Sequence, residues 1–403
     1  MQTGADAAGA AATGGAPEIP FAKPFLGEEE AAAARAAILS GWVTQGPRVR
    51  AFEEAFARRV GAAQAVAVSS CTAALHLVLH ALGVGPGDEV IVPSLSFIAT
   101  ANAVVHAGAT PVFAEVEPEH FTPDPEDVRR RLGPRTRAIM VVDQIGNPAD
   151  LDAFARLAAD PRFAGDARIH IIEDAACAIG SEYRGRPIGA APWPVCFSFH
   201  PRKVLTTGDG GMICTADAGL AARLRSLRQH AMDVSDLDRH GSRRVTLERY
   251  PEVGFNYRMT DIQAAVGLVQ LGRLESLLIR RRELAARYAA GIEASPRLAR
   301  QLRPHRDPPW GRANFQSCAV TLREAPERRN LLLQALLDRG IHTRRGVMTA
   351  HREEAYRRAD GTYASLPVSE RASDASFLLP LYPQMTDADV DRVLGALAEV
   401  LAP

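Results

Sequence analysis

The sequence predicts an α/β protein in two parts: a large part built on a mainly parallel sheet, and a smaller C-terminal α/β part. Short apolar runs typical of strands alternate with helical patterns between residues 65 and 174. Such alternation is typical of a parallel sheet with helices on both faces. A length of 403 residues also exceeds what one small core organises, which favours one large and one smaller domain.

The elements of the large part follow in chain order. Segment 28–39 is Ala-rich and predicts a helix, and segment 49–60 places Phe52, Phe56 and Val60 on one helical face. A further helix is predicted at 73–82. Strands are predicted at 65–70, 88–94, 110–116, 137–143 and 168–174. Ligands bind at the carboxyl ends of strands in such sheets, where this chain has Ser69, Ser70, Ser94 and Asp174.

The remaining chain predicts a second, smaller unit. A long helix is expected from residue 260 to about 293, and it would link the two parts. Beyond it we expect a strand at 314–322 and helices near 326–339 and 386–401. We therefore predict a large domain at 19–270 and a small domain at 271–403. Residues 1–18 are mostly Ala, Gly and Thr and predict a disordered tail.

Composition argues against several classes of function. Net charge is zero, so neither nucleic acid nor an anionic membrane is expected as a partner. No apolar run reaches the roughly 18 residues of a membrane helix, and the first 22 residues carry no Lys or Arg for a secretory signal. The five cysteines are odd in number and lack C-x-x-C spacing, which argues against disulfides and a metal site. We expect a reducing cytoplasmic location.

Lys203 is the first candidate for chemistry. Of the 47 basic residues, only Lys23 and Lys203 are lysines. Arg can supply a surface charge, but it cannot form an imine, whereas a deprotonated Lys amine can. Lys203 lies in FSFHPRKVLTTGDGGMI (197–213), before glycines that would let the backbone pass close to a cofactor. The alternative is a solvated lysine in an ordinary hairpin.

Asp174 is the second candidate, 29 positions before Lys203 at the end of a predicted strand. A carboxylate there often only caps a helix. Together with Lys203, it matches what pyridoxal phosphate (PLP) requires of a protein. An amine must bind the cofactor and shuttle a proton, and a carboxylate must keep the pyridine nitrogen protonated.

The cofactor phosphate has a candidate site in segment 69–74. This segment follows a predicted strand and opens a predicted helix, so its backbone N–H groups and the helix dipole suit an anion. Thr72 and Ser198 could add hydroxyl groups, and Phe97 could stack on the pyridine ring. A simple helix cap and a core phenylalanine are the alternatives. In chain order, these residues would supply a phosphate-binding segment, an aromatic ring that stacks on the cofactor, a carboxylate, a hydroxyl group, the lysine and the glycine turn.

With these motifs the chain resembles the DegT/DnrJ/EryC1/StrS family of PLP-dependent sugar aminotransferases. The resemblance extends from about Ile19 to the C-terminus. It is carried by the Lys203 segment, TRRGV, LPLYPQMT and the blocks SGWVTQGPRVRAFEEAFA (40–57), SSCTAALHL (69–77), PSLSFIATANAVVHAGATPVFAEV (93–116), IEDAACAIGSEYRGRPIG (172–189) and GFNYRMTDIQAAVGLVQL (254–271). It implies the aspartate-aminotransferase fold, fold type I.

The resemblance implies a role for each matching cofactor residue. Lys203 would carry PLP as a Schiff base, and Asp174 would bind the pyridine nitrogen. Cys71 and Thr72 would bind the phosphate through main chain and hydroxyl, with help from Ser198. Phe97 would stack on the ring.

The resemblance also implies a homodimer. Asn256 would reach the phosphate of the neighbouring subunit's cofactor, with Tyr257 and Arg258 beside it near the substrate.

The chain departs from many relatives at three positions. They have Gly where this chain has Cys71, His or Gln where it has Cys177, and Gly where it has Ala231. Cys71 should still bind phosphate through its N–H, whereas Cys177, beside the ring, would be a weaker hydrogen-bond donor. Some members replace the lysine by His and catalyse sugar 3-dehydration, and Lys203 argues against that branch.

The predicted reaction is a ping-pong transfer of an amino group from L-glutamate or glutamine to a nucleotide-linked keto-sugar. Arg258, Arg344 and Arg345 could bind carboxylate or diphosphate oxygens, or could be ordinary surface arginines. A cyclitol ketone as acceptor, or an elimination reaction, is an alternative. A non-catalytic PLP-binding regulator is a further alternative, and the intact Lys–Asp pair and neutral charge argue against it.

Overall fold

A seven-stranded sheet forms the centre of the computed structural model, which describes residues 17–164, 169–234, 245 and 247–402. Five neighbouring strands run parallel, whereas β9 runs antiparallel to both of its neighbours. The predicted mainly parallel sheet is therefore confirmed. Its strands, in spatial order, are β1 (Gln64–Val68), β9 (Gly211–Thr215), β8 (Val195–Ser198), β5 (His170–Asp174), β4 (Thr136–Val142), β2 (Glu89–Pro93) and β3 (Thr110–Ala114).

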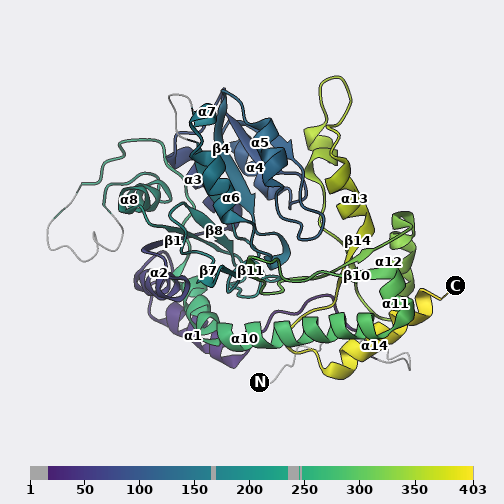
Figure 1. The fold of residues 1–403 in the computed structure, drawn as a ribbon. Coiled ribbons are helices and arrows are strands. Elements are labelled where there is room, and N and C mark those ends of the chain that lie inside the picture. The colour runs from purple at the N-terminus through teal and green to yellow at the C-terminus, as the bar shows by residue number, and fades with distance from the viewer. Residues whose placement is uncertain (1–16, 165–168, 235–244, 246, 403) are drawn as a thin grey trace, which may run out of the picture.

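Helices cover both faces of this sheet (Figure 1). Alternate residues of the strands point to opposite faces, so Val66 and Val90 belong to one core cluster while Ala65 and Ile91 belong to the other. The first cluster includes residues of α3 (Cys71–Ala81), α4 (Ala99–His106) and α8 (Ala218–Leu227). The second includes residues of α2 (Pro47–Val60), α5 (Pro125–Arg131), α6 (Leu151–Ala158) and α10 (Asp261–Ala294). Two further helices are α1 (Glu28–Leu39) and the short α7 (Pro161–Ala164).

Helix α10 connects the two parts of the chain, as predicted. Figure 1 shows it running from α1 and α2 to the C-terminal helices. It begins at a capping box in which Thr260 accepts from the Gln263 N–H. By length and composition, it is the one helix among the described residues that could cross a membrane. That is weak evidence, because the core helix of a globular protein passes the same test.

The C-terminal part has its own sheet and core. Strands β10 (Leu302–Pro304), β12 (Cys318–Leu322), β14 (Ser376–Leu379) and β13 (Arg344–Arg345) pair antiparallel in that order. Its core includes Tyr288, Leu336, Phe377 and Leu397. The helices are α11 (Pro296–Gln301), α12 (Arg329–Leu337), α13 (Pro367–Ala375) and α14 (Asp387–Val400). A small third sheet consists of β11 (Gly311–Arg312), β6 (Glu182–Tyr183) and β7 (Arg186–Pro187). Short 3-10 turns occur at η1 (Gln144–Gly146), η2 (Pro326–Arg328), η3 (Ala350–Arg352) and η4 (Glu354–Tyr356).

Two predicted elements were wrong at their starts. The strand predicted at 314–322 begins only at Cys318, because the buried Asn314 side chain donates to the carbonyls of Cys177 and Ile179 and bends the chain. The helix predicted at 326–339 begins as the 3-10 turn η2 before α12.

The bounds of the predicted tail and of the two predicted domains stay predictions. Within the predicted tail, residues 1–16 lie outside the described residues, whereas the Pro17 carbonyl accepts from Arg392 and Glu18 contacts His342. The boundary at 270/271 stays a prediction, and it falls inside α10.

Candidate active site

The N-terminus of α3 forms the first part of the site. Ser70 caps the helix by accepting from the Ala73 N–H at 3.1 Å, which leaves Cys71 and Thr72 as the first helical residues. First-turn N–H groups have no partner within a helix, so they point outward toward a possible anion. Gly211 of β9 lies so close that a Cβ there would meet the Ser70 carbonyl carbon at 2.6 Å. A glycine at this position therefore lets the turn at Ser70 lie against the sheet.

Asp174 lies at the carboxyl end of β5 and is 5% exposed. Its carboxylate accepts from the Thr100 hydroxyl at 2.8 Å and from the Ala176 N–H at 3.2 Å, and the Cys71 thiol lies 4.0 Å away. Burial raises the pKa of Asp174, against hydrogen bonds from Thr100 and Ala176 and the Lys203 charge, which lower it. These donors give the carboxylate a defined direction.

Lys203 lies in the loop between β8 and β9, and its Nζ donates to the Cys177 Sγ at 3.1 Å. Burial lowers the pKa of the Lys203 amine, but the Cys177 thiol, Cys71 and Asp174 raise it more, so the net pKa is above the ordinary value. The backbone is anchored nearby by the Lys203 N–H, which donates to the His200 carbonyl at 2.8 Å. Cys177 thus contacts the amine directly, and the charges of Cys71 and Asp174 act on it.

Ser198 and Phe97 lie on elements that border this group. Ser198 ends β8 and pairs in register with Gly211, next to the α3 turn. Phe97 lies between β2 and α4 and is 62% exposed, so it is not a core residue. Its carbonyl accepts from the Thr100 N–H, which places Phe97 one turn from the residue that binds Asp174.

Residues 256–258 run beside the end of β1. The Tyr257 carbonyl accepts from the Ser69 N–H at 2.8 Å, and Arg258 pairs with Val68. Asn256 is exposed. The Tyr257 hydroxyl bonds His76 Nδ1 at 2.9 Å, so this side chain is directed to α3 rather than to Lys203.

Arg344 and Arg345 lie on β13 and are exposed. The Arg344 guanidinium lies 5.5 Å from the Phe21 ring centre, and Arg345 lies 3.7 Å from a Glu353 oxygen. Burial first, and the charge of Arg344 second, lower the pKa of Arg202. The charge of Arg344 therefore acts on Arg202, the neighbour of Lys203, whereas Arg345 turns toward Glu353.

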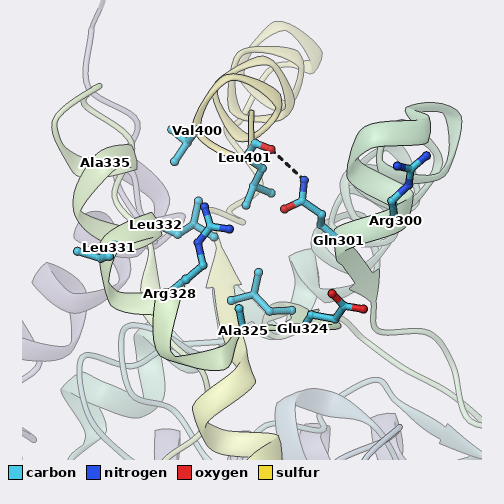
Figure 2. Close-up of a pocket in the computed structure, with 11 residues that line it drawn as sticks. Arg300, Gln301, Glu324, Ala325, Arg328, Leu331, Leu332, Ala335, Val400 and Leu401 are labelled. Carbon is cyan, nitrogen blue, oxygen red and sulfur yellow. Dashed lines mark hydrogen bonds between the residues drawn. The ribbon is translucent and has the colours of Figure 1, made fainter. Parts of the chain in front are cut away.

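The C-terminal part contains a separate cavity of about 440 Å³ between α11, α12 and α14 (Figure 2). Arg300, Arg328 and Glu324 line it, together with apolar side chains such as Leu332. None of the predicted site residues line this cavity. Among the described residues, no group of three or more His, Cys, Asp or Glu side chains is arranged to hold a metal ion.

Two residues that support the site, Thr100 and Gly211, were not predicted from the sequence. Thr100 follows Phe97 by three positions in a predicted helical segment, so helical spacing was an available signal for it. Gly211 belongs to the quoted glycine turn, but only the packing of β9 against Ser70 identifies its role.

Known proteins resemble the chain over almost its whole length. The model of the DegT/DnrJ/EryC1/StrS aminotransferase family matches residues 24–398. The aminotransferase TlmJ of Streptoalloteichus hindustanus is 37% identical over 95% of this chain and 99% of its own, with a TM-score of 0.85. Helicobacter pylori PseC, an aminotransferase involved in the biosynthesis of pseudoaminic acid, is 26% identical over 95% and 99%, with a TM-score of 0.86. A Streptococcus pneumoniae protein solved in its PLP form is 28% identical over 95% and 98%, also at 0.86.

Proposed function

The chain belongs to the DegT/DnrJ/EryC1/StrS aminotransferase family, and on that premise we propose that it transfers an amino group from L-glutamate or glutamine to a nucleotide-linked keto-sugar. Members of this family are PLP-dependent sugar aminotransferases, and the chain is an enzyme of that class. What we propose beyond the family and the enzyme class is the amino donor, the nucleotide linkage and the role of each residue. The single observation that carries it is the arrangement of Lys203, Cys177, Cys71 and Asp174.

The residues present fit PLP. The N-terminus of α3 packs closely against Gly211, and its first-turn N–H groups, which have no partner within the helix, suit a phosphate group. Asp174 is buried and held by two donors, which suits a protonated pyridine nitrogen. PLP, when bound, supplies an electron sink for the carbon that loses its proton. The remaining chemistry falls to the protein.

Lys203 is the residue that we propose carries the cofactor and moves the proton. Its Nζ is held by Cys177 and lies within the electrostatic reach of Asp174. A lysine amine released from the cofactor can take a proton from the donor carbon and return it at the cofactor. The Cys177 contact would keep the amine near that path.

The other residues would bind and orient. Cys71 N–H, the Thr72 hydroxyl and Ser198 would hold the phosphate, since they border the α3 turn. Phe97 would cover the ring, and its exposure makes its face available for stacking.

Arginines near the site would bind the charged groups of the substrates. The charge of Arg344 lowers the pKa of Arg202, and an anion such as a carboxylate or a diphosphate would relieve this repulsion between two guanidinium groups. The pairing of Arg258 with Val68 supports a role near the α3 turn that would bind the phosphate. Arg345 faces Glu353, which makes it the weaker candidate, and the hydrogen bond of Tyr257 to His76 makes Tyr257 weaker too.

We also propose a homodimer in which Asn256 reaches the partner's cofactor phosphate. Asn256 is exposed, and Val245, Leu247 and Val253 nearby are 94%, 83% and 82% exposed. Apolar residues exposed to this degree near one segment favour an interface. The proposed location is the cytoplasm, which the five free cysteines support, with no nucleic acid or membrane as partner.

The donor and acceptor can be tested with purified holoenzyme. Each candidate amino acid is first mixed with enzyme alone, and conversion of the cofactor is followed by its absorbance. The converted enzyme is then mixed with nucleotide keto-sugars, the same sugars without nucleotide, and cyclitol ketones, with product mass as the readout. Amination of a nucleotide-linked ketone alone supports the proposal. Amination only of cyclitols or free sugars would contradict it.

The dimer proposal has its own test by subunit mixing. Lys203→Ala and Asn256→Ala proteins are each expected to be inactive alone. If Asn256 acts across the interface, a mixed dimer contains one intact site, so random exchange should restore about a quarter of the activity. Failure to restore activity, with subunit exchange verified by mass, would contradict the proposal.

A further inference from the structure

Behind the site lies a pair of buried acids for which the reaction provides no role. Asp143 follows β4, Glu173 belongs to β5, and both have 0% exposure. Val141 pairs with Glu173 across β4 and β5, so Asp143, two residues further on, and Glu173 extend from the same face of neighbouring strands. Because a carboxylate only accepts hydrogen bonds, the two carboxyl groups could bond each other only if one of them kept a proton.

The remaining partners of the pair point to the same conclusion. Asp143 Oδ1 accepts from the Ala149 N–H at 2.9 Å, and Glu173 Oε2 accepts from Trp193 Nε1 at 2.7 Å. The other two oxygens, Asp143 Oδ2 and Glu173 Oε1, receive no donor from the described residues. Buried polar atoms are almost always satisfied, and one shared O–H would satisfy both of these oxygens.

The surrounding charges also disfavour two negative groups. Among the described residues, neither acid forms an ion pair with a Lys, Arg or His. The titratable groups whose charges act on the pair are acids or thiols, namely Cys214 on the same face of the sheet, and Asp174 and Cys196 on the other face. Burial, followed by the Glu173 charge, raises the pKa of Asp143, and burial raises the pKa of Glu173. A buried carboxylate without a cation takes up a proton instead.

We propose that Asp143 and Glu173 share one proton and act as a positioning pair that holds the end of β5, and with it the direction of Asp174. Glu173 and Asp174 are consecutive, so their side chains leave opposite faces of the strand. The Asp143 N–H donates to the Asp174 carbonyl at 3.1 Å, and the Glu173 N–H donates to the Pro194 carbonyl at 2.9 Å. Backbone bonds of these two residues thus join the ends of β4 and β5 and the residue before β8, and the shared proton would hold the two side chains at this junction.

The positioning role rests on the proposed part of Asp174, whereas the shared proton does not depend on it. If both acids were ionised, their repulsion would separate the strand ends and turn Asp174. With one proton between them, the pair is a hydrogen bond to a charged group, which is stronger than a neutral one.

The shared proton is tested on the holoenzyme by thermal unfolding across pH. Above about pH 4, where an ordinary carboxyl titrates, the unfolded chain has lost this proton and the folded protein keeps it. Stability from this pair is therefore present at low pH and is lost as the pH rises toward the raised pKa. Asp143→Asn and Glu173→Gln replace the shared O–H by an amide N–H. Each should therefore reduce the slope of the unfolding free energy against pH by the contribution of about one proton.

Infrared spectroscopy gives an independent readout. Near neutral pH, the folded wild-type holoenzyme should show a stronger protonated-carboxyl C=O band than Asp143→Asn, while Glu117, whose pKa burial raises to about 7, contributes equally to both. The proposal is overturned if wild type and both variants have the same slope and wild type and Asp143→Asn have the same band. If one variant fails to fold, the other and the infrared comparison still decide.

Positioning is tested separately by Asp143→Leu, which leaves the Glu173 charge without a partner. We expect kcat to fall about tenfold or more with little change in KM, and Asp143→Asn to restore most of it, as expected for an interaction needed only in the reaction. The absorbance of the bound cofactor should titrate at a shifted pH in Asp143→Leu, because Asp174 is displaced. An unchanged titration with unchanged kcat would overturn the positioning role while leaving the shared proton standing.

Discussion

Strand β5 places two consecutive acids on opposite faces of the main sheet, and their surroundings differ in kind. Asp174 faces the site and accepts from Thr100 and Ala176, with Lys203 close by. Glu173 accepts from Trp193 and otherwise meets another acid. Both are buried, so burial alone does not decide the charge of a carboxyl group. The donors and cations around it do.

On the cofactor face of the sheet, Lys203→Ala should cause the largest loss of activity. Loss of the amine removes both the cofactor attachment and the proton carrier, so we expect activity to fall at least about 10⁴-fold. Borohydride treatment followed by mass spectrometry checks the attachment. The chain offers a matched control in Lys23, its second lysine, which is exposed. An adduct that survives in Lys203→Ala and vanishes in Lys23→Ala would reverse the assignment.

Matched amide substitutions compare the two acids directly. Asp174→Asn should lower kcat by about 10²–10⁴-fold, since a neutral amide cannot keep the pyridine nitrogen protonated. Glu173→Gln should cost less than about tenfold, because the amide still reaches Asp143. Steady-state kinetics of the two holoenzymes measure the ratio. Equal losses would show that the faces of β5 are not functionally distinct.

Thr100→Val sharpens the comparison on the cofactor face. The Thr100 hydroxyl stabilises the ionised form of Asp174, so its loss should raise the pKa of that carboxyl further above its ordinary range. We expect the acidic limb of the kcat/KM profile to move to higher pH, with about a tenfold loss of activity. Thr100→Ser keeps the hydroxyl and serves as the control. If the acidic limb of the kcat/KM profile stays at the same pH, Thr100 does not stabilise the ionised form of Asp174.

Trp193→Phe is the mildest change, on the opposite face. It removes the donor to Glu173 Oε2, and we expect about 1–3 kcal/mol less stability. The kinetics should stay within about threefold, because the shared proton still joins the acids. Trp310→Phe removes an indole donor to the neutral Pro148 carbonyl and is the matched control, with a smaller cost of about 1 kcal/mol. Equal losses of stability in Trp193→Phe and Trp310→Phe would indicate that Glu173 Oε2 carries no negative charge.

Much of the fold was predictable because its signals are local. The predicted strands of the main sheet and helix α1 coincide with the observed elements to within a few residues. The β13 strand and the small sheet of β6, β7 and β11 were not predicted, because strands of two residues carry no periodicity. The start of β12 was placed too early because Asn314 forms bonds to a distant loop.

The sequence by itself determined the family, the fold type and the use of PLP, and these are confirmed. They depend on motifs whose residues are neighbours in the chain, such as the Lys203 segment and the turn at Cys71. Only the tertiary structure decided that Lys203 lies on Cys177, that Thr100 holds Asp174, and that Asp143 meets Glu173. Those contacts depend on which strands become neighbours and in what register, and chain spacing alone carries no information about either.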